Sequence, residues 1–385
     1  MAVLAGPVLT IDLDALRANY RALAARGGAA RCAAVVKADA YGLGADRVAP
    51  ALAASGCRVF FVATLDEGIA LRGVLAGARI YVLNGLPAGA EGEFPRHDLA
   101  PVLNRLDEIE AWGALAAGTG AGAALHLDTG LNRLGLTPDE VAVLAAEPGR
   151  LDGLALDLVI SHMACADQPD HAMNAKQLAA FARLRAGLPP LPASLAASSA
   201  IFLGSDYHFD LLRPGAALYG VNPTPGAPNP MAEVVRLAAP VLQVREVGAG
   251  EPVGYGAEHR MAAPGRIATL PVGYADGFFR ALGHRGSAEI AGQRVPVVGR
   301  VSMDMITLDV SALAPREIEP GTVVDLIGGG LGVDQVAKHA GTNGYEVLTA
   351  LGQRYRRRYL DGAGGAGGTG GAGGAGADPA RAPVA

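Results

Sequence analysis

The sequence predicts an α/β fold in two parts, an N-terminal (β/α)8 barrel over residues 1–230 and a C-terminal, mainly β domain over residues 231–361. Three observations lead to this fold class. The 385 residues exceed one typical domain. Short β-type runs alternate with helix-period segments in the first part, and β-type runs with Gly and Pro turns dominate the second. A Gly- and Ala-rich tail, residues 362–385, lacks large apolar side chains, and we expect it to be disordered.

The barrel prediction starts with a helix at Leu13–Ala25 and depends on the strand candidates that follow it. These eight candidates are Ala33–Val36, Val59–Val62, Ile80–Leu83, Ala100–Leu103, Ala123–Leu127, Ala155–Ile160, Ala193–Ala197 and Phe209–Leu212. Helix-period segments such as LDEGIALRGVL and MNAKQLAAFARLRAG fill most of the gaps, as a parallel sheet requires. Eight such units favour a closed barrel over an open sheet, with the chemistry at the C-terminal ends of the strands.

The pattern changes beyond about Pro230. The stretches VVRLAAPVLQVREV, RIATLPVG, AEIAGQRVPVVGRV and MITLDV are typical of strands between turns. Two helix-like pieces, VDQVAKHAG and YEVLTALGQRY, follow them, which completes the prediction of a mainly β domain.

Composition and charge exclude several classes of protein. With 50% hydrophobic and 18% charged residues, the chain can bury a large core, which predicts a globular protein. The net charge of −5 provides no basic face, so nucleic acid is not an expected partner, and the RYRRR run at 354–358 is expected to be a solvated helix end. Cys32, Cys57 and Cys165 are odd in number and lack close spacing, which predicts reduced thiols and no metal centre.

No segment predicts contact with a membrane. No apolar run approaches the roughly 20 residues of a membrane span, and the first residues, MAVLAGPVLTIDLDAL, lack the positive region of a signal peptide. A cytoplasmic location is therefore expected.

Lys37 is the first candidate for chemistry. It lies in AAVVKADAYGLGA, directly after a predicted buried strand and before a glycine-bearing turn, so its amine is expected at the mouth of the barrel. A partly desolvated lysine loses its proton more easily and can form a Schiff base with an aldehyde cofactor. A strand-end lysine in a salt bridge is the alternative interpretation.

The longer string VVKADAYGLG resembles the cofactor-lysine signature of the alanine racemase family, and further matches extend over residues 8–361. The resemblance implies that Lys37 holds pyridoxal 5′-phosphate (PLP) as a Schiff base. It implies that the chain interconverts L-alanine and D-alanine by two-base proton transfer, which supplies D-alanine for peptidoglycan. It also implies a head-to-tail homodimer whose active sites are shared between subunits.

Two residues are implied as the bases. In the family the cofactor lysine handles the D-alanine proton, which gives this role to Lys37. The segment VGYGAEH resembles the loop of a catalytic tyrosine, which assigns the L-alanine proton to Tyr255 of the partner subunit. A phenol with an ordinary pKa near 10 needs a nearby cation to ionise at neutral pH. Without this context, Tyr255 would be a turn aromatic.

Arg213 is implied as the partner of the cofactor ring, because LLRPGAALYG resembles the family strand end whose arginine faces the pyridine nitrogen. A guanidinium only donates hydrogen bonds, so it keeps that nitrogen unprotonated and weakens the cofactor as an electron sink. A short carbanion lifetime favours simple reprotonation. His162 in SHMACAD matches the histidine that supports this arginine by hydrogen bonding, with a core histidine as the alternative.

Backbone N–H groups and hydroxyls are expected to bind the cofactor phosphate at the barrel mouth. The resemblance assigns this role to Tyr41, Ser199, Gly215 and Ala216. Ser198 stands where the family often has Asn. In LGQRYRRRY an ungapped match puts Gln353 at the place of a phosphate-binding tyrosine, with Tyr355 two positions on, and this contact stays unassigned.

Four further residues are implied to bind substrate alanine. Arg133, in HLDTGLNRLGL, would orient its carboxylate by charge-assisted hydrogen bonds. Many family members hold this arginine with a carbamylated lysine where this chain has His126, so a bound anion or a neighbouring carboxylate must replace that contact. The segments PVGYADG and GRVSMDM give Tyr274 at the substrate entrance and Met303 with Asp304 near the carboxylate.

Three further functions stay open at this point. A PLP-dependent decarboxylase shares the barrel type, but it should carry a carboxylate in place of Arg213. A non-enzymatic PLP-binding protein should have one barrel without the β domain. A racemase of broader amino-acid specificity differs only in its substrate range.

Overall fold

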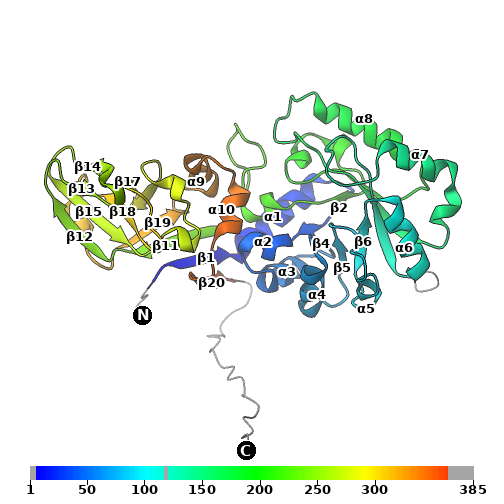
Figure 1. The fold of residues 1–385 in the computed structure, drawn as a ribbon, viewed down its shortest axis with the longest axis horizontal. Helices are drawn as coiled ribbons and strands as arrows, with labels where there is room; N and C mark the ends of the chain where they lie inside the picture. The colour runs from blue at the N-terminus through cyan, green and yellow to red at the C-terminus, as the bar shows by residue number, and fades with distance from the viewer. Residues whose placement is uncertain (1–5, 117–119, 363–385) are drawn as a thin grey trace, which may run out of the picture.

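The computed structural model describes residues 6–116 and 120–362. A helix-covered barrel and a strand-rich unit lie side by side in it (Figure 1). Apart from Gly362, the tail predicted to be disordered lies outside the described residues. Within the described residues, no helix has both the length and the apolar character that crossing a membrane requires.

The predicted barrel of parallel strands is confirmed. Its eight positions are β2 with β3 (Arg31–Cys32 and Ala34–Val35), β4 (Val59–Val62), β5 (Arg79–Val82), β6 (Ala100–Leu103), β7 (Gly122–His126), β8 (Ala155–Ile160), β9 (Ala193–Ser194) and β10 (Leu211–Leu212). Strands β3 to β9 form one parallel sheet, and β10 pairs in parallel with β2. A parallel bridge between Ala197 and Arg213 joins the ends that follow β9 and β10, so the barrel closes.

Helices connect the barrel strands. They are α1 (Leu13–Arg26), α3 (Ala45–Ala54), α4 (Leu65–Val74), α5 (Glu93–Arg96), α6 (Leu106–Ala116), α7 (Pro138–Ala146) and α8 (Met173–Arg185). The predicted opening helix is α1, and its N-cap Asp12 accepts the N–H groups of the first turn. Helices α4 and α7 both begin with a capping box, in which Thr64 pairs with Glu67 and Thr137 with Glu140.

Side chains fill the barrel interior. Phe61 of β4 stacks on Tyr81 of β5 with ring centroids 4.9 Å apart. Nearer the start of β5, Arg79 pairs with Asp157 at 2.6 Å, and the hydroxyl of Tyr81 donates to the same carboxylate at 2.8 Å. This packing closes the N-terminal end, so space for a ligand lies at the opposite end of the strands.

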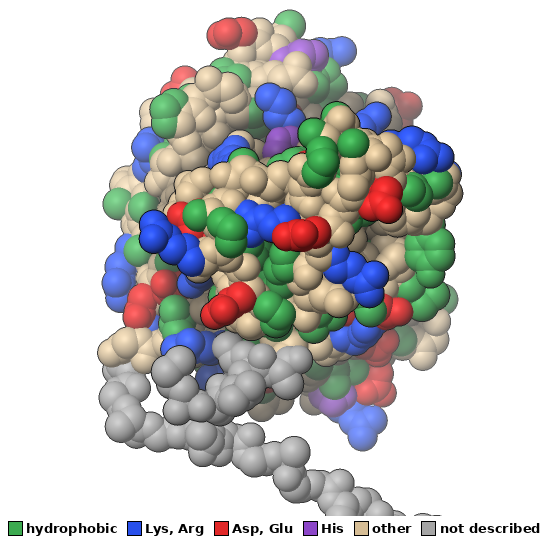
Figure 2. Space-filling view, turned by 90° about the vertical axis from the view of Figure 1, so that its left-hand side faces the viewer, with side chains coloured by type: hydrophobic (Ala, Val, Ile, Leu, Met, Phe, Trp, Pro, Cys, Tyr) green, Lys and Arg blue, Asp and Glu red, His purple; other side chains and the backbone are tan. Residues whose placement is uncertain are grey.

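The C-terminal unit is built on a nine-stranded sheet. Across the sheet the strands are β12 (Gln243–Val247), β15 (Gly265–Leu270), β18 (Ile306–Asp309), β17 (Gln293–Val298), β16 (Ser287–Ile290), β19 (Val323–Ile327), β11 (Val235–Pro240), β1 (Val8–Asp12) and β20 (Arg356–Leu360). A hairpin of β13 (Pro252–Val253) and β14 (His259–Arg260) and the helices α9 (Val333–Ala340) and α10 (Gly344–Ala350) complete it. Figure 2 shows the end of the molecule formed by this unit, where positive and negative side chains are mixed.

Two features of the C-terminal sheet differ from the prediction. Strand β1, which was not predicted, pairs antiparallel with β11 and parallel with β20. The interpretation of RYRRR as a helix end was wrong, because most of this run lies in β20 at the edge of the sheet. The strand forms because β1, at the other end of the chain, supplies its backbone partners, and arginines on an edge strand discourage pairing with other chains.

Candidate active site

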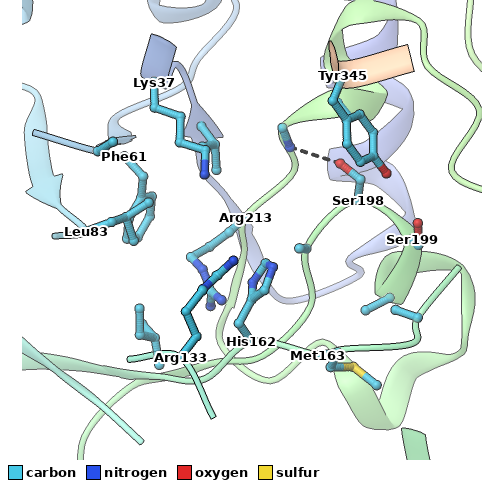
Figure 3. Close-up of a pocket in the computed structure, with 18 of the residues that line it drawn as sticks. Lys37, Phe61, Leu83, Arg133, His162, Met163, Ser198, Ser199, Arg213 and Tyr345 are labelled. Carbon is cyan, nitrogen blue, oxygen red and sulfur yellow. Dashed lines mark hydrogen bonds between the residues drawn. The ribbon is translucent and has the colours of Figure 1, made fainter. Parts of the chain in front are cut away.

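A cavity of about 700 Å³ lies at the C-terminal ends of the barrel strands (Figure 3). Eight predicted site residues line it: Lys37, Tyr41, Arg133, His162, Ser199, Arg213, Gly215 and Ala216. Lys37, Arg213, Arg133 and His162 come from different barrel positions and point toward a common space. Closure of the barrel therefore gathers residues that are far apart in the sequence.

Lys37 begins the turn α2 (Lys37–Gly42), which follows β3. Burial lowers the pKa of Lys37 below its ordinary value, and the charge of Arg133 lowers it further, whereas Glu67 acts in the opposite direction. A lysine with a lowered pKa more readily supplies the neutral amine that attacks an aldehyde. The geometry thus fits covalent attachment of an aldehyde cofactor at this amine.

Arg213 follows β10 and is buried in the cavity wall. Its Nη1 donates to the Ser194 carbonyl at 2.7 Å, and its Nη2 donates to the Ser161 carbonyl at 2.5 Å. Burial lowers the pKa of Arg213 to about 9, so the guanidinium is still protonated near pH 7. The two carbonyls fix the plane of the guanidinium, which therefore presents donors, and never an acceptor, to a ring placed in the cavity.

His162 lies beside Arg213, but among the described residues the hydrogen bonds of the guanidinium go to Ser194 and Ser161 and not to this ring. The backbone carbonyl of His162 accepts from Gln177 at 3.0 Å. Burial lowers the pKa of His162 to about 3, and the Arg213 charge contributes to the shift. The ring is therefore neutral near pH 7, and backbone carbonyls, rather than His162, hold the arginine in this structure.

One wall of the cavity carries hydroxyls and a backbone turn of the kind that can hold a phosphate. The Ser198 hydroxyl accepts the N–H of Gly215 at 3.0 Å and that of Ala217 at 3.2 Å, which fixes the turn before η4 (Ala216–Tyr219). A Cβ added at Gly215 would lie 2.3 Å from the Tyr41 hydroxyl, so only glycine allows this close approach. Hydroxyls and a backbone turn fit a phosphate because both can donate hydrogen bonds.

Tyr345 also lines the cavity and was not predicted as a site residue. It belongs to α10 of the C-terminal unit, and its ring lies beside Ser198 in Figure 3. The phosphate contact left unassigned near Gln353 and Tyr355 is at neither residue, because Gln353 is exposed, Tyr355 is buried, and neither lines the cavity. No local pattern could have identified Tyr345, because α10 reaches the barrel mouth only through contacts between the two units.

His126 ends β7 and lines the cavity near Arg133. Its Nδ1 lies 2.8 Å from Asn104 Oδ1, and burial lowers its pKa to about 4. The neighbouring Asp128 accepts backbone N–H groups of the loop, among them that of Gly130 at 2.9 Å. Within the described residues, no carboxylate pairs with the Arg133 guanidinium. The structure therefore does not support the expectation that a neighbouring carboxylate holds this arginine.

Four predicted residues lie on the C-terminal unit, outside the cavity lining: Tyr255, Tyr274, Met303 and Asp304. Three of them lie on two adjoining segments: Tyr274 donates its N–H to the Ser302 carbonyl at 3.0 Å, and the next residue, Ala275, donates to the Met303 carbonyl at 3.0 Å. Asp304 follows Met303 and pairs with Arg354 at 2.8 Å. Tyr255 is 73% exposed. Within one chain, these residues do not complete the site around Lys37.

Comparison with known proteins matches both parts of the chain. The family model of the alanine racemase N-terminal domain matches residues 11–223, and that of the C-terminal domain matches residues 234–359. A protein of Rhodospirillum rubrum named alanine racemase is 53% identical and covers 91% of this chain and 95% of its own. A protein of Mesorhizobium japonicum named "Alanine racemase, catabolic" is 52% identical and covers 93% of this chain and 94% of its own.

Solved structures agree with these matches. The crystal structure of alanine racemase from Bartonella henselae with covalently bound pyridoxal phosphate is 42% identical, has a TM-score of 0.89 and covers 92% of this chain and 100% of its own. Biosynthetic alanine racemase from Pseudomonas aeruginosa is 37% identical, has a TM-score of 0.86 and covers 92% of this chain and 99% of its own. With both domain models matched and the fold shared over nearly the whole length, the chain belongs to the alanine racemase family.

Proposed function

We propose that this protein interconverts L-alanine and D-alanine, with PLP bound to the amine of Lys37. The observation that supports this most directly is the position of Lys37, which lies partly desolvated in the same cavity as the buried Arg213. The names of the relatives and the covalently bound cofactor of the Bartonella henselae structure agree with it.

PLP would be held at both of its ends. Tyr41, Ser199, Gly215 and Ala216 surround the proposed phosphate position, and Tyr345 adds a hydroxyl from the C-terminal unit. Arg213 would donate a hydrogen bond to the ring nitrogen. When bound, PLP would withdraw electrons from the α-carbon of the substrate, and Arg213 would limit this withdrawal because a guanidinium does not give up its proton to the ring.

Proton movement requires one group on each face of the α-carbon. Lys37 would take or return the proton on the D-alanine side, because its neutral amine is favoured by burial. Tyr255 of the partner subunit would act on the L-alanine side. Arg133 and the backbone N–H of Met303 would orient the substrate carboxylate, with Asp304 beside it and Tyr274 at the entrance.

This assignment requires a homodimer whose subunits pack head to tail. Tyr255 is 73% exposed and Met303 is 53% exposed, although both would be needed at the reacting centre. Tyr274 and Met305 are also exposed large side chains of this unit, and a second subunit that covers these residues would remove them from water. A second copy of this chain would bring them over the barrel mouth and complete each cavity.

A chiral assay tests the function directly. Purified protein is incubated with PLP and one L-amino acid at a time, and chiral separation measures the D-amino acid that forms. Alanine should be converted fastest. Equal rates with several amino acids would favour a broad-specificity racemase, and release of CO₂ would favour a decarboxylase. Arg213 favours racemisation over decarboxylation, and the C-terminal unit favours an enzyme over a protein that only binds PLP.

The cellular role follows from this chemistry. We place the enzyme in the cytoplasm, where it would supply D-alanine for peptidoglycan, and its three free cysteines agree with a reducing compartment. Expression should restore growth of a bacterial strain that requires added D-alanine. Growth that still depends on D-alanine, with the protein present in the cytoplasmic fraction, would contradict this role.

A further inference from the structure

The turn that follows Lys37 has an unusual backbone. Ala38, Asp39, Ala40 and Tyr41 have φ values of 52°, 53°, 54° and 56°. Four consecutive non-glycine residues in the left-handed region are unfavourable, because each Cβ lies too close to the backbone. Such a turn persists only when surrounding contacts fix it.

A carboxylate from the next barrel unit fixes the first residue of this turn. Glu67 of α4 accepts the N–H of Ala38 on Oε1 at 2.7 Å. Its second oxygen, Oε2, accepts the N–H of Ala63 at 2.7 Å, at the end of β4. One half-buried side chain therefore ties the Lys37 turn to the neighbouring strand.

Two further side-chain hydrogen bonds of the turn lie farther along the chain from Lys37. Asp39 accepts the N–H of Ala45 at 2.7 Å, and Arg357 of β20 donates to the Gly42 carbonyl at 2.7 Å. These contacts fix the end of the turn. Glu67 acts at the peptide unit that directly follows the lysine.

We propose that Glu67 is a positioning residue for Lys37, which holds the first peptide of the left-handed turn so that the lysine amine points into the cavity. The inference rests on the proposed role of Lys37. Hydrogen bonds from backbone N–H groups to a carboxylate are among the stronger ones in proteins, so losing this one should release the turn.

The chain offers two matched controls. Thr64→Ala opens the capping box of α4 but leaves both oxygens of Glu67 in place. Glu140→Ala opens the equivalent box of α7, where Glu140 accepts the N–H of Thr137 at 2.8 Å, on a different barrel unit from the Lys37 turn. Both controls measure the cost of a lost helix cap.

The experiment compares Glu67→Ala with both controls in the PLP-loaded enzyme. Hydrogen exchange at the Ala38 amide should become at least about tenfold faster in Glu67→Ala, and kcat should fall by at least about tenfold with KM changed by less than about threefold. Both controls should stay within about twofold of the unmodified enzyme in exchange and in kcat. Exchange and kcat of Glu67→Ala equal to those of the controls would overturn the inference.

Two further arms keep the test decisive. If Glu67→Ala does not fold, Glu67→Gln takes its place, because its single amide oxygen cannot replace the two carboxylate oxygens that together accept the N–H groups of Ala38, Ala63 and Thr64. Faster Ala38 exchange in that variant supports the inference, and unchanged exchange opposes it. An unmodified enzyme without racemase activity would refute the proposed function, whereas the exchange measurement would still decide the role of Glu67.

Discussion

The barrel mouth and the exposed face of the C-terminal unit differ in how far a single chain completes them. Arg213 is 4% exposed, and backbone carbonyls hold its guanidinium, whereas Tyr255 is 73% exposed. Burial and fixed hydrogen bonds therefore order the barrel half of the proposed site within a single chain. The residues proposed for the other half lie on an exposed face and are not enclosed.

The same difference separates the two proposed bases, because one is enclosed within a single chain and the other is not. Lys37 lies in a walled cavity that lowers its pKa. Tyr255 lies on the surface of the C-terminal unit, so under the proposed function a second subunit would have to enclose it. The following changes test each half separately.

Lys37→Ala should have the largest effect, because it removes both the proposed anchor and one base. We expect racemisation to fall by more than about 10⁴-fold. The visible absorbance of bound PLP should disappear after dialysis. A borohydride-reducible link between PLP and another lysine would contradict the assignment.

Tyr255→Phe removes one hydroxyl and should leave PLP binding intact. Racemisation should fall by about 10²- to 10⁴-fold in both directions, because each direction needs both bases. Mixing Lys37→Ala with Tyr255→Phe subunits should restore one working site per heterodimer. Heterodimers as inactive as their parents would show that Tyr255 does not serve the partner's Lys37.

Arg213→Glu should have a smaller effect, which is visible in the spectrum. A carboxylate could keep a proton on the ring nitrogen and strengthen the electron sink, so absorbance at long wavelength should rise during turnover. Racemisation should slow by about a hundredfold. Arg213→Lys, which keeps a cation, is the control and should not show the new absorbance. Unchanged spectra and rates in a folded Arg213→Glu protein would refute the role.

The barrel side of this comparison was predictable from local patterns. Short apolar runs between amphipathic helices identified the eight strands, and the position of Lys37 at a strand end followed from them. The apolar periodicity of each strand and helix is contained in a short stretch of sequence, because each β/α unit buries one face against the adjacent units.

Contacts between distant segments could not be predicted in this way. Strand β20 depends on β1, and Tyr345 reaches the cavity only because α10 packs against the Lys37 turn. The backbone carbonyls of Ser194 and Ser161 hold Arg213. Because every residue has a backbone carbonyl, the residue types in the sequence do not reveal this contact. Tyr255, Tyr274 and Met303 were identified by resemblance, and their joint role stays a prediction because it depends on a second chain.

The smallest predicted effect is on the pH dependence of stability and concerns His126. It tests the buried barrel mouth without an activity assay. Burial and the Arg213 charge lower its pKa from about 6.5 to about 4. As the pH falls below 6.5, the unfolded chain takes up a proton that the folded chain refuses until about pH 4. The stability present above pH 6.5 is therefore lost progressively as the pH falls toward 4.

His126→Asn removes this titration. Between pH 7 and pH 4.5, the free energy of unfolding of the variant should therefore fall by about 2 kcal/mol less than that of the unmodified protein. Urea unfolding at fixed protein concentration measures the difference. His162 is present in both proteins, and its pKa of about 3 keeps it neutral in the folded protein over this pH range, so its contribution is nearly the same in both even though the His126 charge is one of the causes of its shift. Replacement of the exposed His171 by Asn is the matched surface control. An equal loss of stability in His126→Asn and the unmodified protein would show that acid sensitivity arises outside this part of the barrel mouth.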